Sequence, residues 1–145
     1  MQTGMETSVK TLNSFLRGEI SAVETYRQAL EKVETPPLRT TLEDCLRSHQ
    51  MRVDLLKRRV ATLGGDPATE SGPWGTFAKL VEGSAKVFGD KAAIAALEEG
   101  EDHGRNDYRR DIDKLDAESR QLVERQVLPE QERTHQELST LKKAV

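Results

Sequence analysis

Residues 7–33 read TSVKTLNSFLRGEISAVETYRQALEKV, and this stretch decides the fold. Its core-type residues recur at alternating intervals of three and four, which places them on one stripe of a helix that packs in a bundle. One member of the stripe is charged, Glu19. The stripe consists of Val9, Leu12, Leu16, Glu19, Val23, Tyr26, Leu30 and Val33. The segment is therefore predicted to be a long helix with a carboxylate on its core-facing side.

Three further segments have the same helical periodicity. The second opens at Pro36, a proline in the first turn, and ends at a Gly-Gly pair. The third follows Asp90, and the fourth begins near Asp116 and should be kinked by Pro129, which lacks an N–H donor. The core-facing stripes are Leu38, Leu42, Cys45, His49, Val53, Leu56, Val60 and Leu63 in the second; Ile94, Leu97, Glu101, Gly104, Tyr108, Ile112 and Leu115 in the third; and Leu128, Glu132, His135, Leu138 and Leu141 in the fourth.

The lengths of the joins predict how these helices connect. Helices one and two, and helices three and four, are only a few residues apart, so each pair should form an antiparallel hairpin. The 27 residues 64–90 separate helices two and three and could span a bundle about 40 Å long, with a short amphipathic helix at residues 74–88. We therefore predict one all-α domain over residues 1–145: a four-helix bundle with a long, ferritin-type crossover between helices two and three, which run parallel. An up-down-up-down bundle with a long excursion is the alternative.

The composition supports a helical protein and argues against several classes of function. Charged residues make up 32% of the 145 residues and aromatic residues 4%, a balance unlike that of a β-sandwich. The net charge of −3, with both signs interspersed, provides no basic surface for nucleic acid. No apolar run suits a membrane span or a signal peptide, and the single cysteine, Cys45, fits a reducing compartment. We expect a cytoplasmic protein that binds neither nucleic acid nor membrane.

The two hairpins resemble each other in sequence. The Gly-Glu pair at Glu19, followed seven residues later by Tyr26, recurs as Glu101 followed by Tyr108. The triplet Ser-His-Gln at residues 48–50 recurs as Thr-His-Gln at residues 134–136. Two hairpins that match in this order indicate an internal repeat.

Five polar residues near the helix midpoints are predicted to meet at one level of the core. They are Glu19, His49, Glu101, Glu132 and His135. Buried carboxylates need compensation, and a divalent cation provides it, because carboxylate and imidazole are common ligands of iron, manganese and zinc. The alternative is a metal-free layer in which the glutamates are protonated or bonded to the histidines, the tyrosines and nearby arginines such as Arg52. The five residues together favour the metal site.

The chain resembles a known group of proteins in these residues. The polar residues are similar to the di-iron carboxylate layout of the ferritin-like superfamily. The features that match are Glu19 followed by Tyr26, a histidine in helix two, a glutamate in helix three, and Glu132-x-x-His135. More narrowly, the run from Cys45 through LGGDP at residues 63–67, with EEGEDH at residues 98–103 and PEQERTH at residues 129–135, resembles an uncharacterised bacterial family of ferritin-like four-helix-bundle proteins. The resemblance covers nearly the whole chain.

The resemblance implies roles for the polar residues. Glu19 and Glu101 would be terminal ligands, Glu132 a bridge, and the two histidines would each cap one metal. Tyr26 and Tyr108 are core-filling residues, and each could also bond a ligand glutamate of the opposite hairpin and orient it. 

The chain departs from the ferritin-like pattern in helix two. Leu46 stands three residues before His49, where that pattern has a glutamate, so one bridging carboxylate is missing. Cys45 or Glu98 could supply a further ligand, although a structural cysteine and a solvated glutamate are the commoner roles.

Two functions from different classes follow. The first is a protein with one or two iron or manganese ions in the bundle core, acting in redox chemistry, metal handling or stress; any enzymatic activity would be ferroxidase-like, coupling iron oxidation to reduction of O2 or peroxide. The second is a non-catalytic interaction or stress protein that has kept the fold and lost the cluster. The Glu132/His135 pair favours the first, and Leu46 favours the second. The expected partners are metal ions and a second copy of the chain in a homodimer.

Overall fold

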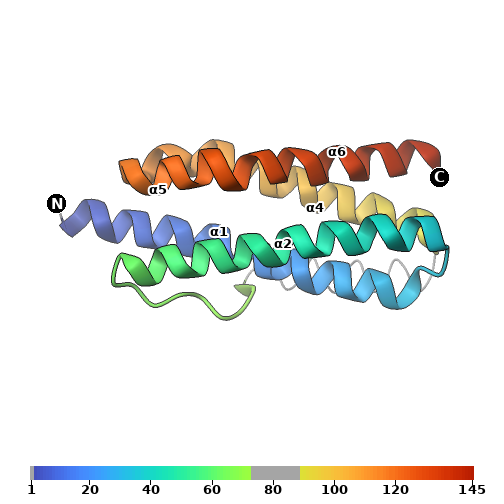
Figure 1. Ribbon diagram of the computed structural model, residues 1–145, viewed down its shortest axis with the longest axis horizontal. Helices are drawn as coiled ribbons and strands as arrows, with labels where there is room; N and C mark the ends of the chain where they lie inside the picture. Colours follow the sequence, from blue (N-terminus) through green and yellow to red (C-terminus); the bar gives the residue numbers. More distant parts are fainter. Residues whose placement is uncertain (1, 73–88) are drawn as a thin grey trace.

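The computed structural model describes residues 2–72 and 89–145, and these residues form a bundle of four long helical segments (Figure 1). The first is α1 (Gln2–Lys32), the second α2 (Pro36–Thr62) and the third α4 (Asp90–Asp111). The fourth is a continuous run of α5 (Ala117–Leu122), a π-helical turn η3 (Val123–Val127) and α6 (Leu128–Ala144). A 3-10 turn, η2 (Ile112–Lys114), precedes it. The described residues contain no strand, so the predicted all-α four-helix bundle is confirmed.

Local sequence signals explain where α2 begins and ends. Pro36 is its first residue, where a missing N–H leaves no hydrogen bond unmade. At the other end Gly64 has a φ of 83°, which a glycine adopts without steric cost. The N–H of Gly64 bonds the carbonyl of Ala61 and the N–H of Gly65 bonds the carbonyl of Val60. This pair of bonds is a Schellman motif, which satisfies the last carbonyls of the helix.

The helices alternate in direction within each hairpin, and α2 and α4 run the same way along the bundle (Figure 1). The first residues of α2 and α4 are neighbours, because the hydroxyl of Thr35 donates to Asp90 Oδ2 at 2.9 Å. The connection predicted between these helices is only partly described. Its residues 66–72 lie alongside α1, where the Asn13 side chain bonds the carbonyl of Asp66 and the N–H of Ala68. The remainder of the crossover, including the short helix predicted at residues 74–88, lies outside the described residues, apart from Gly89, which directly precedes α4.

Two apolar clusters fill the core, one toward each end of the bundle. The first contains Tyr26, Ala29, Val33, Leu38, Leu42, Cys45, Ala93, Ile94, Leu97 and Leu138. The second contains Leu12, Phe15, Leu16, Leu56, Val60, Tyr108, Leu115, Val123 and Val127. The charged residues Glu19, His49, Arg52 and Glu101 are buried between them. The bundle therefore has apolar ends and a charged middle layer.

The fourth helical segment turns a different stripe to the core from the one predicted. The buried residues of its second half are Val127, Gln131, Thr134 and Leu138, spaced by four, three and four. Leu138 of the predicted stripe is buried as expected, but Glu132 and His135 are each one position away from the buried Gln131 and Thr134, so that part of the prediction is wrong. The interruption predicted at Pro129 takes the form of a π-helical turn that ends two residues before it, so that Pro129 lies in the first turn of α6, where a missing N–H is tolerated.

None of the described helices combines the length and the apolar character needed to span a membrane.

Candidate functional site

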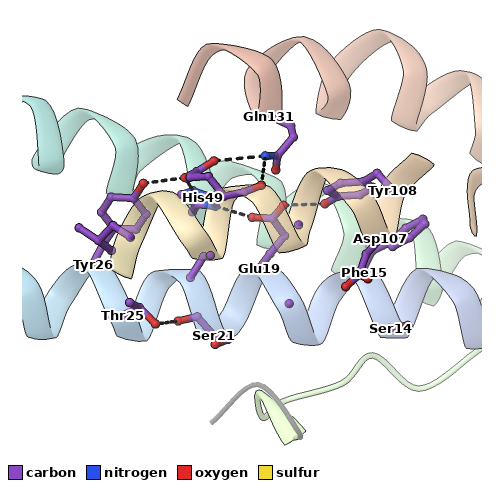
Figure 2. Close-up of a pocket in the computed structure, with 16 residues that line it drawn as sticks. Ser14, Phe15, Glu19, Ser21, Thr25, Tyr26, His49, Asp107, Tyr108 and Gln131 are labelled. Atoms are coloured by element: carbon purple, nitrogen blue, oxygen red, sulfur yellow. Dashed lines mark hydrogen bonds and ion pairs between the residues drawn. The ribbon is translucent and has the colours of Figure 1, made fainter. Parts of the chain in front are cut away.

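The charged layer is centred on the imidazole of His49, which lies between two carboxylates (Figure 2). Its Nδ1 is 2.6 Å from Glu19 Oε1 and its Nε2 is 2.7 Å from Glu101 Oε2. The side chain is only 4% exposed. Ionised carboxylates only accept hydrogen bonds, so both ring nitrogens donate and the ring is an imidazolium.

The charges of the layer set the protonation states of its members. Burial lowers the pKa of His49, as does Arg52, but the carboxylates of Glu101 and Glu19 outweigh them and raise it above its ordinary value. Burial raises the pKa of Glu101, yet the interactions with His49 and Arg52 bring it down to about 2. The pKa of Glu19 is likewise lowered: burial is opposed by Arg52 and His49. These directions agree with the geometry, in which His49 donates from both ring nitrogens to two ionised carboxylates.

Two tyrosines extend this arrangement symmetrically. Tyr26 on α1 donates to Glu101 Oε2 on α4 at 2.6 Å, and Tyr108 on α4 donates to Glu19 Oε2 on α1 at 2.6 Å. Burial, with the neighbouring carboxylate, raises the pKa of each tyrosine well above its ordinary value, so both remain neutral donors. The result is a hydrogen-bonded chain of five side chains across the two hairpins, and each tyrosine bonds the glutamate of the opposite hairpin, as the sequence suggested.

Arg52 supplies the second positive charge of the layer. Its side chain is fully buried. Its Nη2 donates to Ser48 Oγ at 2.9 Å and Thr134 Oγ1 at 2.7 Å, and its Nη1 donates to Gln131 Oε1 at 3.0 Å and Glu19 Oε2 at 3.4 Å. Two carboxylates, one imidazolium and one guanidinium together give the layer a net charge of zero, which offsets much of the cost of burying each ion.

The second oxygen of Glu101 is also occupied. Thr134 Oγ1 donates to Glu101 Oε1 at 2.8 Å, and Gln131 Nε2 donates to the same atom at 3.2 Å. Over the described residues, the buried side-chain atoms that lack a hydrogen-bond partner all lie outside this layer. The network is therefore complete as built from protein groups.

The structure brings together three of the five predicted metal ligands and separates the other two. Glu132 lies on the outer face with its side chain 53% exposed, and its Oε1 is 3.3 Å from Nη2 of Arg109. His135 is 14% exposed and pairs through Nε2 with Asp102 on α4. Both residues are rotated away from the core because Gln131 and Thr134 occupy the stripe. The prediction that Glu132 and His135 join the central layer is corrected accordingly.

A family comparison places the chain. Residues 7–114, more than half of it, match the family described as Domain of unknown function (DUF2383). The chain belongs to this family. The match includes all four charged residues of the central layer and both tyrosines, and it ends before α5 and α6. No curated protein and no solved structure matches the chain significantly.

The donor set of this DUF2383 protein does not fit the predicted iron or manganese centre. Glu19 and Glu101 lie on opposite sides of the His49 ring and use both of its nitrogens, so the three side chains do not face a common point. Among the described residues no group of three or more His, Cys, Asp or Glu side chains is arranged to hold an ion. The two further donors considered from the sequence are directed elsewhere: Cys45 Sγ donates to Glu137 at 3.1 Å, and Glu98 accepts from Lys142 at 2.9 Å.

A narrow cleft between α1 and α4 reaches the central layer (Figure 2). Small residues from both helices form its walls, among them Gly18, Ser21, Gly100 and Gly104. Its volume of about 40 Å³ accommodates water but no organic molecule of ordinary size. The cleft borders the carboxylates of Glu19 and Glu101 and has no room for a large substrate.

Sequence reasoning missed Arg52, Gln131 and Thr134 as members of the layer, although Arg52 was considered as a partner in the metal-free alternative. A signal for each was present. Alternating intervals of three and four run from Cys45 through His49 and Arg52 to Leu56, and the same alternation selects Gln131 and Thr134. Arg52 is next to the apolar Val53, and Gln131 and Thr134 are next to Glu132 and His135 of the predicted metal motif. In each case the neighbouring residue was assigned to the core-facing stripe instead.

Proposed function

We propose that this DUF2383 protein is a non-catalytic helical-bundle module in which two protein cations take the place of a metal centre. The observation that carries the proposal is the pairing of both Glu19 and Glu101 with the imidazolium of His49, and of Glu19 with the guanidinium of Arg52. Each carboxylate already has the opposite charges and donors that a metal and its ordering contacts would supply. 

The central layer then serves to hold the two hairpins in one register. Glu19 of the first hairpin bonds Tyr108 of the second, while Glu101 of the second bonds Tyr26 and His49 of the first. A shift of one hairpin along the other would leave buried charges unpaired, which costs several kcal/mol. This use of buried polar groups to specify one arrangement is known from other helical assemblies.

The size of the cleft also supports a non-catalytic module. Sites for organic ligands enclose about 300–1,000 Å³, whereas the cleft that reaches the layer measures about 40 Å³. Within residues 2–72 and 89–145, the outer faces of the helices are surfaces available for interaction. The partner class, the homodimer, the bacterial source and the cytoplasmic location remain predictions from the sequence.

The test is metal binding by the wild-type chain. Protein purified without chelator should contain far less than one iron, manganese or zinc ion per chain, and EDTA should leave its melting temperature unchanged. One or two tightly bound ions per chain, with a lower melting temperature after EDTA, would contradict the proposal.

A mononuclear iron or manganese site is the second candidate, and the cleft favours it. Glu19, His49 and Glu101 all line the cleft, so an ion could reach them from solvent. Binding would require the two carboxylates to release His49 and turn to one side of it. The same metal analysis distinguishes the candidates, since this one predicts an ion bound with Arg52 still present.

A further inference from the structure

Arg52 occupies an enclosed cradle of oxygen atoms. Besides Glu19 Oε2 at 3.4 Å, its acceptors are the neutral oxygens of Ser48 at 2.9 Å, Thr134 at 2.7 Å and Gln131 at 3.0 Å, together with the carbonyl of Glu130 at 3.3 Å. Of these only Glu19 carries a formal charge. Oxygen atoms of carboxylates, carbonyls and amides are the ligands that hard divalent cations prefer.

The internal repeat shows that one cation serves both hairpins. Ser48 and Thr134 are equivalent positions of the repeat, and both hydroxyls accept from the same Nη2. Arg52 lies four residues after Ser48, and Leu138 lies four residues after Thr134. Both side chains are fully buried. The first hairpin therefore supplies the cation, and the second supplies an apolar side chain at the matching position.

We infer that Arg52 holds the cation position of the central layer and thereby keeps divalent metal ions out of it. The inference rests on the proposed function, because it names one residue, Arg52, as the reason why the layer does not bind a metal ion. The guanidinium fills the oxygen cradle and carries the charge that an ion would bring. Without it, the cradle and the adjoining Glu19, His49 and Glu101 form a buried, anionic, oxygen-rich space, which suits a hard divalent cation such as Mn²⁺.

The test is Arg52→Met, which keeps the apolar part of the side chain and removes the charged end. Thermal melts are recorded with EDTA and with millimolar Mn²⁺, and bound manganese is measured after gel filtration. The variant should melt well below wild type in EDTA, and Mn²⁺ should raise its melting temperature by about 3 °C or more. Wild type should not respond to Mn²⁺.

Three control variants separate this role from general effects. Arg52→Lys retains a cation and should show no response to Mn²⁺. Adding Glu19→Gln to Arg52→Met removes a carboxylate from the space and should abolish most of the response. Arg59→Met removes a partly buried arginine on the same helix, which bonds Ser119 and Asp116 instead of the layer, and should also show no response.

The outcomes distinguish the inference from the proposed function. An Arg52→Met protein that binds no manganese and gains no stability from it overturns the inference alone. A wild type that binds manganese overturns both. If Arg52→Met is unfolded in EDTA, refolding from urea is compared with and without Mn²⁺: recovery only with the metal supports the inference, and recovery in neither condition overturns it.

Discussion

Replacing Glu101 by glutamine should destabilise the protein far more than an ordinary surface change. Glu101 accepts from His49 at 2.7 Å, Tyr26 at 2.6 Å, Thr134 at 2.8 Å and Gln131 at 3.2 Å. Glutamine has one acceptor oxygen, so two of these donors would face an NH2 group, and the layer would carry an unbalanced positive charge. Removing one partner of a buried ion pair costs about 3–5 kcal/mol in the free energy of unfolding.

The control is Glu98→Gln, which makes the same chemical change one turn earlier on α4. Glu98 pairs with Lys142, whose side chain is 52% exposed, and the loss of such a surface pair costs about 0–1 kcal/mol. Urea unfolding followed by circular dichroism gives both free energies, with unchanged slopes indicating comparable unfolded states. Losses for the two variants that agree within 1 kcal/mol would refute the account of the central layer.

Three further predictions follow from the same contacts. Folding raises the pKa of His49, so its contribution to stability should be complete below the ordinary pKa of 6.5 and be lost as the pH rises through the folded-state pKa. Folding lowers the pKa of Glu101 to about 2, so its contribution should be complete above the ordinary pKa of 4.5 and be lost as the pH falls toward 2. The melting temperature should therefore be highest between pH 4.5 and 6.5 and decline toward both lower and higher pH. Tyr26→Phe and Tyr108→Phe each remove one of the two donors to a buried carboxylate oxygen, leaving His49 on Glu101 Oε2 and Arg52 on Glu19 Oε2. Each should cost a similar amount, about 1–3 kcal/mol in urea unfolding, and markedly unequal losses would argue against the symmetric arrangement. In Gly65→Ala the new methyl would lie 2.6 Å from a valine methyl of α1, and a melting temperature unchanged from wild type would contradict the expected loss of about 1–3 kcal/mol.

The fold was predictable because several local signals agree. The intervals of three and four in residues 7–33, the proline at the start of α2 and the Gly-Gly pair at its end each specify a helix or its boundary without knowledge of the partners. The contacts of Tyr26 and Tyr108 with the glutamates of the opposite hairpins were also anticipated, because all four residues lie on the core-facing stripes of their helices.

The composition of the central layer was harder to predict, for a physical reason. A fully buried arginine is rare and is stable only where all its donors find acceptors. The acceptors of Arg52 come from three helices: Ser48 on its own helix, Glu19 on α1, and Glu130, Gln131 and Thr134 on α6. That cradle exists only after the helices pack, so the sequence indicated Arg52 only as a possible partner of the glutamates and not as a buried member of the layer. In the fourth helix, the apolar Leu128 and the Glu-x-x-His motif favoured a stripe one residue away from the real one.

The protonation state of His49 tests the central claim most directly. Nuclear magnetic resonance of the imidazole nitrogens in 15N-labelled protein reports whether each ring nitrogen carries a proton, and His49→Gln assigns its signals among those of the three histidines. We predict that at pH 7.5 both nitrogens of His49 are protonated and hydrogen-bonded, as an internal cation between Glu19 and Glu101 requires. A neutral ring with one unprotonated nitrogen at this pH would contradict the account.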